Sequence, residues 1–190
     1  NALRNRIVPE VKFAHDPIST DLKSLSEIEL VVVIERSADS QLFSWLLFRY
    51  HYLGFRFSVG ENIKYLVKTK DGVPLACLLF SSAAWKTAPR DQFIGWSLNQ
   101  REQNLRFIAN NTRFLILPWV SVPNLASYIL AKVIKRIRLD WQKKYGHTLY
   151  LLETFVEQSR YQGTCYLAAN WIKTGETTGR TRDDSKHKIK

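Results

Sequence analysis

The amino-acid sequence predicts one mixed α/β domain, in which helices flank a central, mostly antiparallel sheet. Three observations lead to this fold class. Apolar β-branched and alternating segments, which are typical of strands, occur among segments with helical spacing. Two alternating segments meet at an Asp-Gly dipeptide, the strongest short-range signal of an antiparallel hairpin. The 190 residues suffice for one substantial hydrophobic core and not for two comfortable ones.

The expected elements begin with a short buried strand and a helix. Residues 28–34 are apolar and rich in β-branched side chains, which favour strands. Ser37 and its neighbours provide capping groups for a helix that runs through Tyr50. Residues 63–68 and 73–80 then form the two strands of the hairpin.

A long helix dominates the second half of the chain. From Asn124 to Tyr145 apolar residues recur every three or four positions, and Gly146 provides a C-cap. Such a helix places an apolar stripe against the core and a polar face toward solvent. The other elements expected here are a loop over residues 85–97, a polar helix over 98–109, strands over 113–117 and 148–156, and a short helix over 164–171.

The two ends of the chain are expected to lie outside this domain of residues 28–172. Residues 1–27 contain two prolines and mixed charge, which predicts an irregular arm or linker. Because the sequence begins at Asn1 and contains no Met, we expect the arm to follow an upstream region that is absent from it. Residues 173–190 have almost no apolar content, which predicts a flexible basic tail.

The net charge is the outlying feature of the composition. Twenty-eight Lys and Arg face seventeen Asp and Glu, for a formal charge of +11 at pH 7. The tail contributes six basic and three acidic residues, so +8 belongs to the rest of the chain. This balance makes a polyanion the default partner, with nucleic acid favoured over an anionic membrane surface. Many basic domains bind no anion specifically, and that alternative stays open.

The cysteines and the hydropathy of the sequence indicate in which compartment the protein works. Cys77 and Cys165 form no CxxC pattern and lie among apolar residues, which predicts reduced, buried thiols and a cytoplasmic protein. No apolar stretch approaches the roughly 18 residues of a membrane-spanning helix, and no signal peptide is visible. We therefore expect no membrane partner.

The order of elements resembles the GNAT superfamily of N-acetyltransferases. That resemblance implies a splayed sheet, whose opening holds acetyl-CoA beside the strand that leads into the long helix. Those enzymes carry a glycine-rich turn of the type Q/R-x-x-G-x-G/A there, and its amides bind the pyrophosphate at the helix N-terminus. The corresponding residues, 120–127, contain no Gly and include Pro123. We therefore expect neither acetyl-CoA nor another cofactor, while a divalent metal stays open.

A second resemblance rests on short stretches of sequence that occur in a fixed order. Together they are similar to the DruA family, known from the Druantia anti-phage defence system and from transposase-associated proteins. Coverage runs from Arg49 to Arg182, and Thr181 departs from the family by replacing a Gly. The resemblance implies a defence or transposon-linked role, with defence-system or transposase partners, and implies no particular reaction. The stretches are Tyr50–Gly54, Ala88–Asp91, Ile94–Ser97, Asn110–Val120, Glu153–Val156, Gly163–Tyr166 and Ala169–Trp171.

Three residues are candidates for catalysis. Glu153 lies in an apolar strand, where a carboxylate is costly unless it is paired or faces a cleft. It is therefore a candidate general base or metal ligand, or the partner of Arg113 or another Arg in a structural ion pair. Asp91 can orient a phosphate held by Arg90 or bind a metal, or it can form with Arg90 a salt bridge that fixes the loop. His51 can act as acid or base, or hydrogen-bond to the backbone at a helix end.

Basic residues supply the candidates for nucleic-acid binding. The long helix contains only one acid, Asp140, so most of its cations have no partner within the helix. This favours contacts with a phosphate backbone and predicts a DNA-binding domain, although a solvated face would have the same composition. The alternatives are an enzyme, either a degenerate acyltransferase or a nuclease using Glu153 and Asp91, and a scaffold with an exposed Trp patch. The proposed contacts are Arg90, Arg101, Arg106, Arg113, Lys132, Lys135, Arg136, Arg160, Lys173, Arg180 and Arg182.

Overall fold

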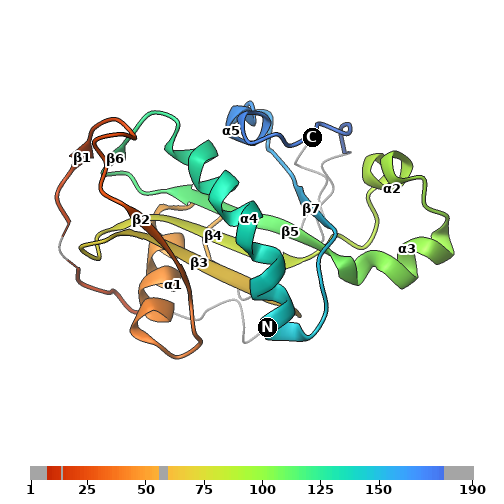
Figure 1. Cartoon of the computed structure of the whole chain (residues 1–190), viewed down its shortest axis with the longest axis horizontal. Coiled ribbons are helices and arrows are strands. Elements are labelled where there is room, and N and C mark those ends of the chain that lie inside the picture. Colours follow the sequence, from red (N-terminus) through yellow and green to blue (C-terminus); the bar gives the residue numbers. More distant parts are fainter. Residues whose placement is uncertain (1–7, 14, 56–59, 178–190) are drawn as a thin grey trace.

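The computed structural model describes residues 8–13, 15–55 and 60–177. At its centre lies a five-stranded sheet in the order β2-β3-β4-β5-β7 (Figure 1). Neighbouring strands are antiparallel except for β5 and β7, which are parallel. This confirms the mixed α/β class with a mostly antiparallel sheet. The strands are β2 (Ile28–Val32), β3 (Asn62–Thr69), β4 (Pro74–Ser82), β5 (Ile108–Ile116) and β7 (Leu151–Thr154).

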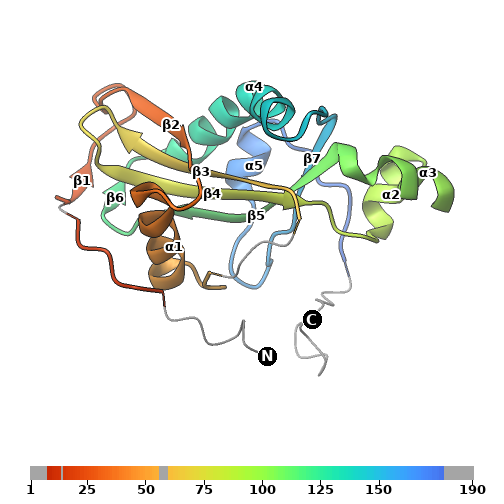
Figure 2. The same cartoon turned by 90° about the horizontal axis from the view of Figure 1, so that it is seen from below.

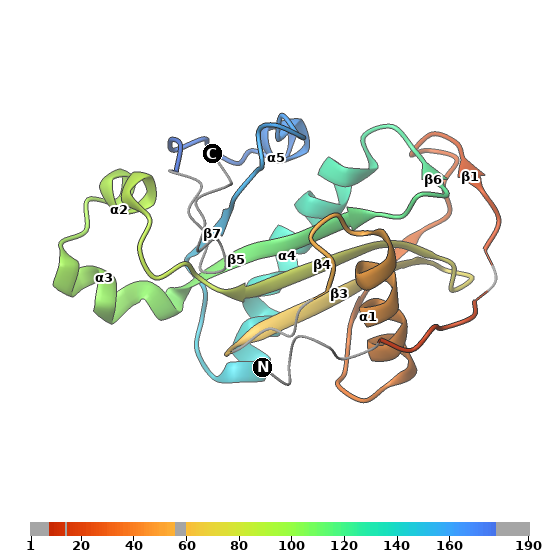
Figure 3. The same ribbon diagram turned by 180° about the vertical axis from the view of Figure 1, so that it is seen from behind.

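One long helix covers each face of the sheet. Helix α1 (Ala38–Tyr50) lies on one face and α4 (Leu125–Tyr145) on the opposite face (Figures 2 and 3). The Ser37 hydroxyl caps α1 by accepting the Ser40 N–H, and Gly146 ends α4 in the left-handed region at φ +76°. The start of α1 and the end of α4 therefore agree with the sequence prediction.

The core forms where these helices meet the central hairpin. Strands β3 and β4 pair along their length around the predicted turn, in which Gly72 adopts φ +86°. Residues 75–80 of β4 are buried on both faces of the sheet, since a helix lies over each. From α4, the core receives Ile129, Val133 and Trp141, which belong to the apolar stripe seen in the sequence. Hydrophobic burial of this kind is the main source of stability.

The segment between β4 and β5 differs from its prediction. Residues 85–97 are not a plain loop, because α2 (Ala88–Ile94) forms there with Pro89 in its first turn and Gly95 as its left-handed cap. The next helix, α3 (Leu98–Asn104), is shorter than predicted, and a single 3₁₀ turn, η1 (Leu105–Phe107), follows it. Both α2 and α3 project beyond the end of the sheet (Figures 1 and 3).

Strand β5 begins at Ile108, five residues before the predicted start. The first residues of β5 include polar side chains that local propensity would place at a helix end, and in the structure they pair within the sheet. Asn111 shows how, because its side-chain amide donates to the carbonyls of Leu79 (3.2 Å) and Arg113 (3.0 Å) and so is satisfied inside the sheet. Tertiary pairing therefore decides this boundary.

The sheet opens between β5 and β7. Their pairing runs only from Ile108 with Leu151 to Asn111 with Thr154, while β5 continues to Ile116. The last helix, α5 (Thr164–Ala168), lies beside α4 near this opening (Figure 1). Its Tyr166 hydroxyl donates to Asn111 Oδ1 at 2.7 Å, at the last paired position of the two strands.

Both flanking segments contact the domain where the structure describes them. Strand β1 (Ile18–Ser19) pairs in parallel with β6 (Val120–Ser121), just before α4. After α5 the chain returns to α2, where a Cβ on Gly175 would lie 2.9 Å from Pro89 Cβ. No helix among the described residues combines the length and hydropathy needed to cross a bilayer.

Candidate functional site

The most strongly connected buried charges lie where the ends of β4 and β7 meet α2. Arg90 and Glu153 have side chains only 5% and 9% exposed, and Arg90 Nη1 donates to Glu153 Oε2 at 3.0 Å. The same nitrogen donates to the Ala84 carbonyl at 2.8 Å. Arg90 Nε and Nη2 donate to Asp91 Oδ1 at 2.9 and 2.7 Å. One guanidinium thus links a strand, a turn and a helix.

The Glu153 carboxylate is occupied by protein donors on both oxygens. The Ala84 N–H donates to Oε1 at 2.7 Å, while Arg90 takes Oε2. Burial raises the pKa of the Glu153 carboxyl, and the hydrogen bonds from Ala84 and Arg90 act in the opposite direction. The structure therefore pairs Glu153 with Arg90, whereas Arg113 donates elsewhere, to the carbonyls of Gly54 and Thr112.

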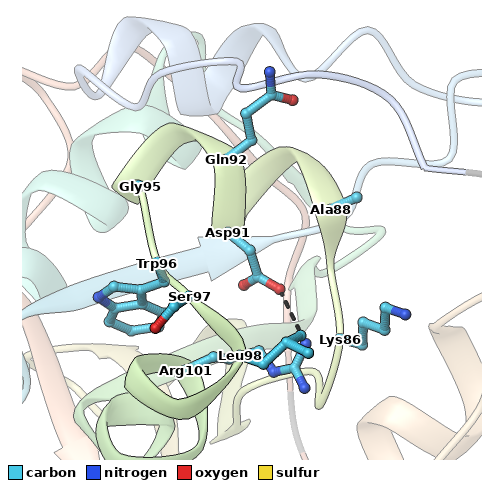
Figure 4. A pocket seen from close by; sticks show the side chains of 9 residues that line it. All are labelled: Lys86, Ala88, Asp91, Gln92, Gly95, Trp96, Ser97, Leu98 and Arg101. Carbon is cyan, nitrogen blue, oxygen red and sulfur yellow. Dashed lines mark ion pairs between the residues drawn. The ribbon is translucent and has the colours of Figure 1, made fainter.

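A cavity of about 480 Å³ lies between α2 and α3, next to this network (Figure 4). Asp91 connects the two, because its Oδ1 accepts from Arg90 and its Oδ2 lies 3.6 Å from Arg101 Nη1. Glu153 is absent from the cavity wall. The lining residues are Lys86, Ala88, Asp91, Gln92, Gly95, Trp96, Ser97, Leu98 and Arg101.

Sequence reasoning selected Asp91 and Arg101 but missed Lys86, Gln92 and Leu98 as parts of one wall. Their common location depends on α2, which the prediction replaced by a loop. The available signal was a proline followed six residues later by a glycine, which marks the two ends of a short helix.

His51 lies at the C-terminus of α1 and not in the Arg90 network. Its N–H donates to the Leu47 carbonyl, and its Nδ1 accepts the Leu53 N–H at 3.1 Å. Burial, with a smaller contribution from the Arg113 charge, lowers the pKa of His51 to about 4. The ring is therefore neutral at physiological pH and acts as an acceptor at the helix end.

The other predicted nucleic-acid contacts lie on several elements. Arg106 lies over the Phe107 ring at 4.7 Å, Arg160 pairs with Glu157 at 3.1 Å, and Lys173 pairs with Glu176 at 3.1 Å. Arg180 and Arg182 lie outside the described residues. Three of the predicted contacts, Lys132, Lys135 and Arg136, lie on a single element, α4.

The turn before α4 differs from the glycine-rich turn that binds the pyrophosphate of coenzyme A in N-acetyltransferases, since residues 120–127 contain no Gly. Pro123 has no N–H to donate. The Val120 N–H donates to the Leu117 carbonyl at 2.9 Å, and the Leu125 N–H donates to the Val122 carbonyl at 3.2 Å. Two N–H groups near this turn are therefore used inside the protein, while no side chain caps the first turn of α4 at Asn124.

Metal chemistry has no assembled donor set in the part of the chain that the structure describes. No three His, Cys, Asp or Glu side chains gather there in a way that could hold a metal ion. Asp91 and Glu153, the two predicted acids, are separated by the Arg90 guanidinium that binds both.

Replacing Arg90 with Met should lower the free energy of unfolding by about 3–5 kcal/mol, because Glu153 would stay buried without its cation. Arg160→Met provides the control, since its pair with Glu157 is exposed and should contribute less than about 1 kcal/mol. Urea unfolding followed by tryptophan fluorescence measures both. Equal losses in the two variants would contradict the structural role of Arg90.

His51 should make stability depend on pH between 6.5 and 4. Its folded pKa lies below the unfolded value of 6.5, so its contribution is complete above pH 6.5 and is lost as pH falls toward 4. His51→Asn keeps an acceptor for the Leu53 N–H and cannot titrate. Relative to this variant, the wild type should lose about 2 kcal/mol over that range, allowing for partial solvent screening. A difference that stays constant with pH would contradict this assignment.

Comparison with known proteins places the chain in a family. Among curated proteins there is no match. The crystal structure of aminoglycoside antibiotic 6'-N-acetyltransferase AAC(6')-Ih from Acinetobacter baumannii superposes with a TM-score of 0.50 at 13% sequence identity, covering 83% of this chain and 99% of that one. This likeness confirms the GNAT-like fold and, at that identity, concerns the fold alone. The family described as Druantia protein DruA matches residues 6–188. Since that match spans almost the whole sequence, the chain belongs to the DruA family, which implies a role in anti-phage defence.

Proposed function

We propose that the chain binds nucleic acid, DNA foremost, through the exposed face of α4. The binding would serve anti-phage defence or a transposon-linked process in the cytoplasm, with defence-system or transposase proteins as partners. It needs no cofactor. The observation that carries the proposal is the excess of unpaired cations on α4.

The single acid of α4 is fully engaged. Asp140 accepts from Arg136 Nε at 2.7 Å and from the Tyr65 hydroxyl at 2.7 Å. Arg136 also donates to the Leu30 carbonyl, which ties it to the sheet. Within the described residues, no carboxylate lies in ion-pair distance of the other five α4 cations, which are Lys132, Lys135, Arg138, Lys143 and Lys144.

These cations differ in how firmly the protein holds them. Arg138 donates to Thr148 Oγ1 at 2.8 Å, and Lys144 donates to the Asn62 carbonyl at 2.6 Å. Lys132, Lys135 and Lys143 donate no hydrogen bond to the described residues. The Lys132 ammonium lies 5.1 Å from the centroid of the Tyr128 ring, and all three lysines keep their hydrogen-bond donors available for an anion.

The three free lysines follow one side of the helix. At about 1.5 Å per residue, Lys132 and Lys143 are about 16 Å apart along the axis, with Lys135 between them. Double-stranded DNA carries one negative charge per about 1.7 Å, so a row of this length meets several phosphates. Exposed Tyr128 and Leu139 lie among the lysines and offer apolar contact. This supports backbone contact, with single-stranded or distorted DNA as the preferred form.

The enzyme alternative has weaker support. The neighbouring acetyltransferase shares only the fold, and Asp91 does reach a cavity. However, both Glu153 oxygens accept hydrogen bonds from the protein, so a general base at this position would first have to release Arg90 or the Ala84 N–H. That makes the backbone-binding function the better supported of the two.

Charge removal on α4 should lower both affinity and its salt dependence. In the variant K132Q/K135Q/K143Q, the slope of log affinity against log salt should fall by about 3 for duplex DNA, because each lost phosphate contact removes about 0.9. Fluorescence anisotropy with a labelled oligonucleotide between about 50 and 200 mM salt measures this slope.

The matched control is K12Q/K23Q/K70Q, which removes the same charge from exposed lysines outside α4. Its slope should stay close to that of the wild type. Equal slopes in both triple variants would contradict the placement on α4. Absence of binding to any DNA or RNA at low salt, together with a rise in melting temperature on adding acetyl-CoA, would contradict the function and favour the enzyme.

A further inference from the structure

Arg101 is a buried cation whose guanidinium makes no hydrogen bond to the described residues. The residue is only 6% exposed, and its Nε has no partner. The nearest carboxylate oxygens are Asp91 Oδ2 at 3.6 Å from Nη1 and Glu102 Oε1 at 4.0 Å from Nη2, both beyond hydrogen-bond range. Buried donors of this kind are rare, because leaving them unsatisfied is costly.

Arg90, which binds the other oxygen of Asp91, differs from Arg101 because its guanidinium donates to several acceptors. Arg90 donates four hydrogen bonds, to Asp91, Glu153 and Ala84. The two carboxylates therefore already serve one guanidinium with short contacts. Arg101 has only longer contacts, to the second oxygen of Asp91 at 3.6 Å and to Glu102 Oε1 at 4.0 Å, so its two terminal nitrogens can still donate to another acceptor.

Arg101 lies on the wall of a cavity, while its unpartnered Nε is itself shielded from solvent. Arg101 and Asp91 form one wall of the space of about 480 Å³ between α2 and α3, where their charged groups face each other (Figure 4). This volume lies within the range of roughly 300–1,000 Å³ that is typical of small-molecule sites. Lys86, also on the wall, is exposed and has no carboxylate partner among the described residues.

Aromatic side chains accompany these cations. Trp85 is 63% exposed, and the Arg101 guanidinium carbon lies 5.7 Å from the centroid of its ring. Trp96 forms another part of the cavity wall. An exposed indole next to a cation is the arrangement on which unpaired bases stack in single-strand-binding proteins.

We propose that this cavity binds one nucleotide, with its phosphate on Arg101 and Lys86 and its base stacked on Trp85. Arginine suits this role because its planar fork matches the oxygens of a phosphate. Asp91 orients Arg101 from the side, since its other oxygen is fixed by Arg90. The nucleotide belongs to a single strand whose backbone follows α4, so in this form the inference rests on the proposed function. A free mononucleotide is the other source of the same chemistry.

Two probes separate these sources, a labelled single-stranded dT oligonucleotide and deoxyadenosine 5'-monophosphate. Trp85→Ala and Lys86→Gln alter exposed side chains, so both variants should fold. Each should weaken oligonucleotide binding about tenfold, and only Lys86→Gln should lower the salt slope, by about 0.7. Quenching of tryptophan fluorescence measures mononucleotide binding, which Arg101→Gln should abolish. Phe48→Ala, which alters an exposed aromatic on α1, should leave the binding of both probes unchanged.

The outcomes distinguish this inference from the proposed function. If Arg101→Gln does not fold, Arg101→Lys is the alternative, because it keeps the charge and removes the planar guanidinium. This variant should lose most of its affinity for the mononucleotide. Oligonucleotide binding that depends on α4 but is equal in wild type, Trp85→Ala and Lys86→Gln would overturn the cavity and leave the proposed function standing. Mononucleotide binding that needs Arg101, with no oligonucleotide binding at low salt, would support the cavity as a free-nucleotide site and overturn the proposed function.

Discussion

The ion pair between Arg90 and Glu153 is the interaction on which one end of the molecule depends. A carboxylate inside a short strand is tolerable only when donors surround it, and Arg90 with the Ala84 N–H provides them. The same guanidinium holds Asp91, which in turn faces Arg101. The position of α2, the shape of the cavity and the orientation of its second arginine therefore follow from a single buried cation.

Local sequence patterns predict those parts of the fold whose stability is local. The Asp71-Gly72 hairpin and the stripe of α4 were recognisable because turn chemistry and helical periodicity act within a few residues. Helix α2 was missed because Pro89 and Gly95 indicate a loop as readily as the two ends of a short helix. The partner of Glu153 was ambiguous for a different reason. Arg90 is 63 positions away in the sequence, so only the sheet topology brings the two together.

The GNAT-like fold is the one found in N-acetyltransferases, whereas the side chains around α4 support a different function. The sheet opens between β5 and β7, as the resemblance to GNAT proteins implies, yet the turn before α4 contains Pro123 and no Gly, and the Val120 and Leu125 N–H groups donate inside the protein. The outer face of α4, proposed above for a polyanion, presents Lys132, Lys135 and Lys143, none of which has a carboxylate in ion-pair distance among the described residues. Because a fold does not fix a function, this fold is compatible with the proposed recognition of a ligand by charge along a helix.

The central claim, that the free lysines of α4 form the nucleic-acid surface, is tested most directly by lysine footprinting. Exposed amines are acetylated with a small reagent in the absence and presence of DNA, and each site is quantified by mass spectrometry. The account predicts that DNA protects Lys132, Lys135 and Lys143, while Lys23 and Lys70 react equally in both conditions. Uniform protection of all lysines, or protection that spares α4, would contradict it.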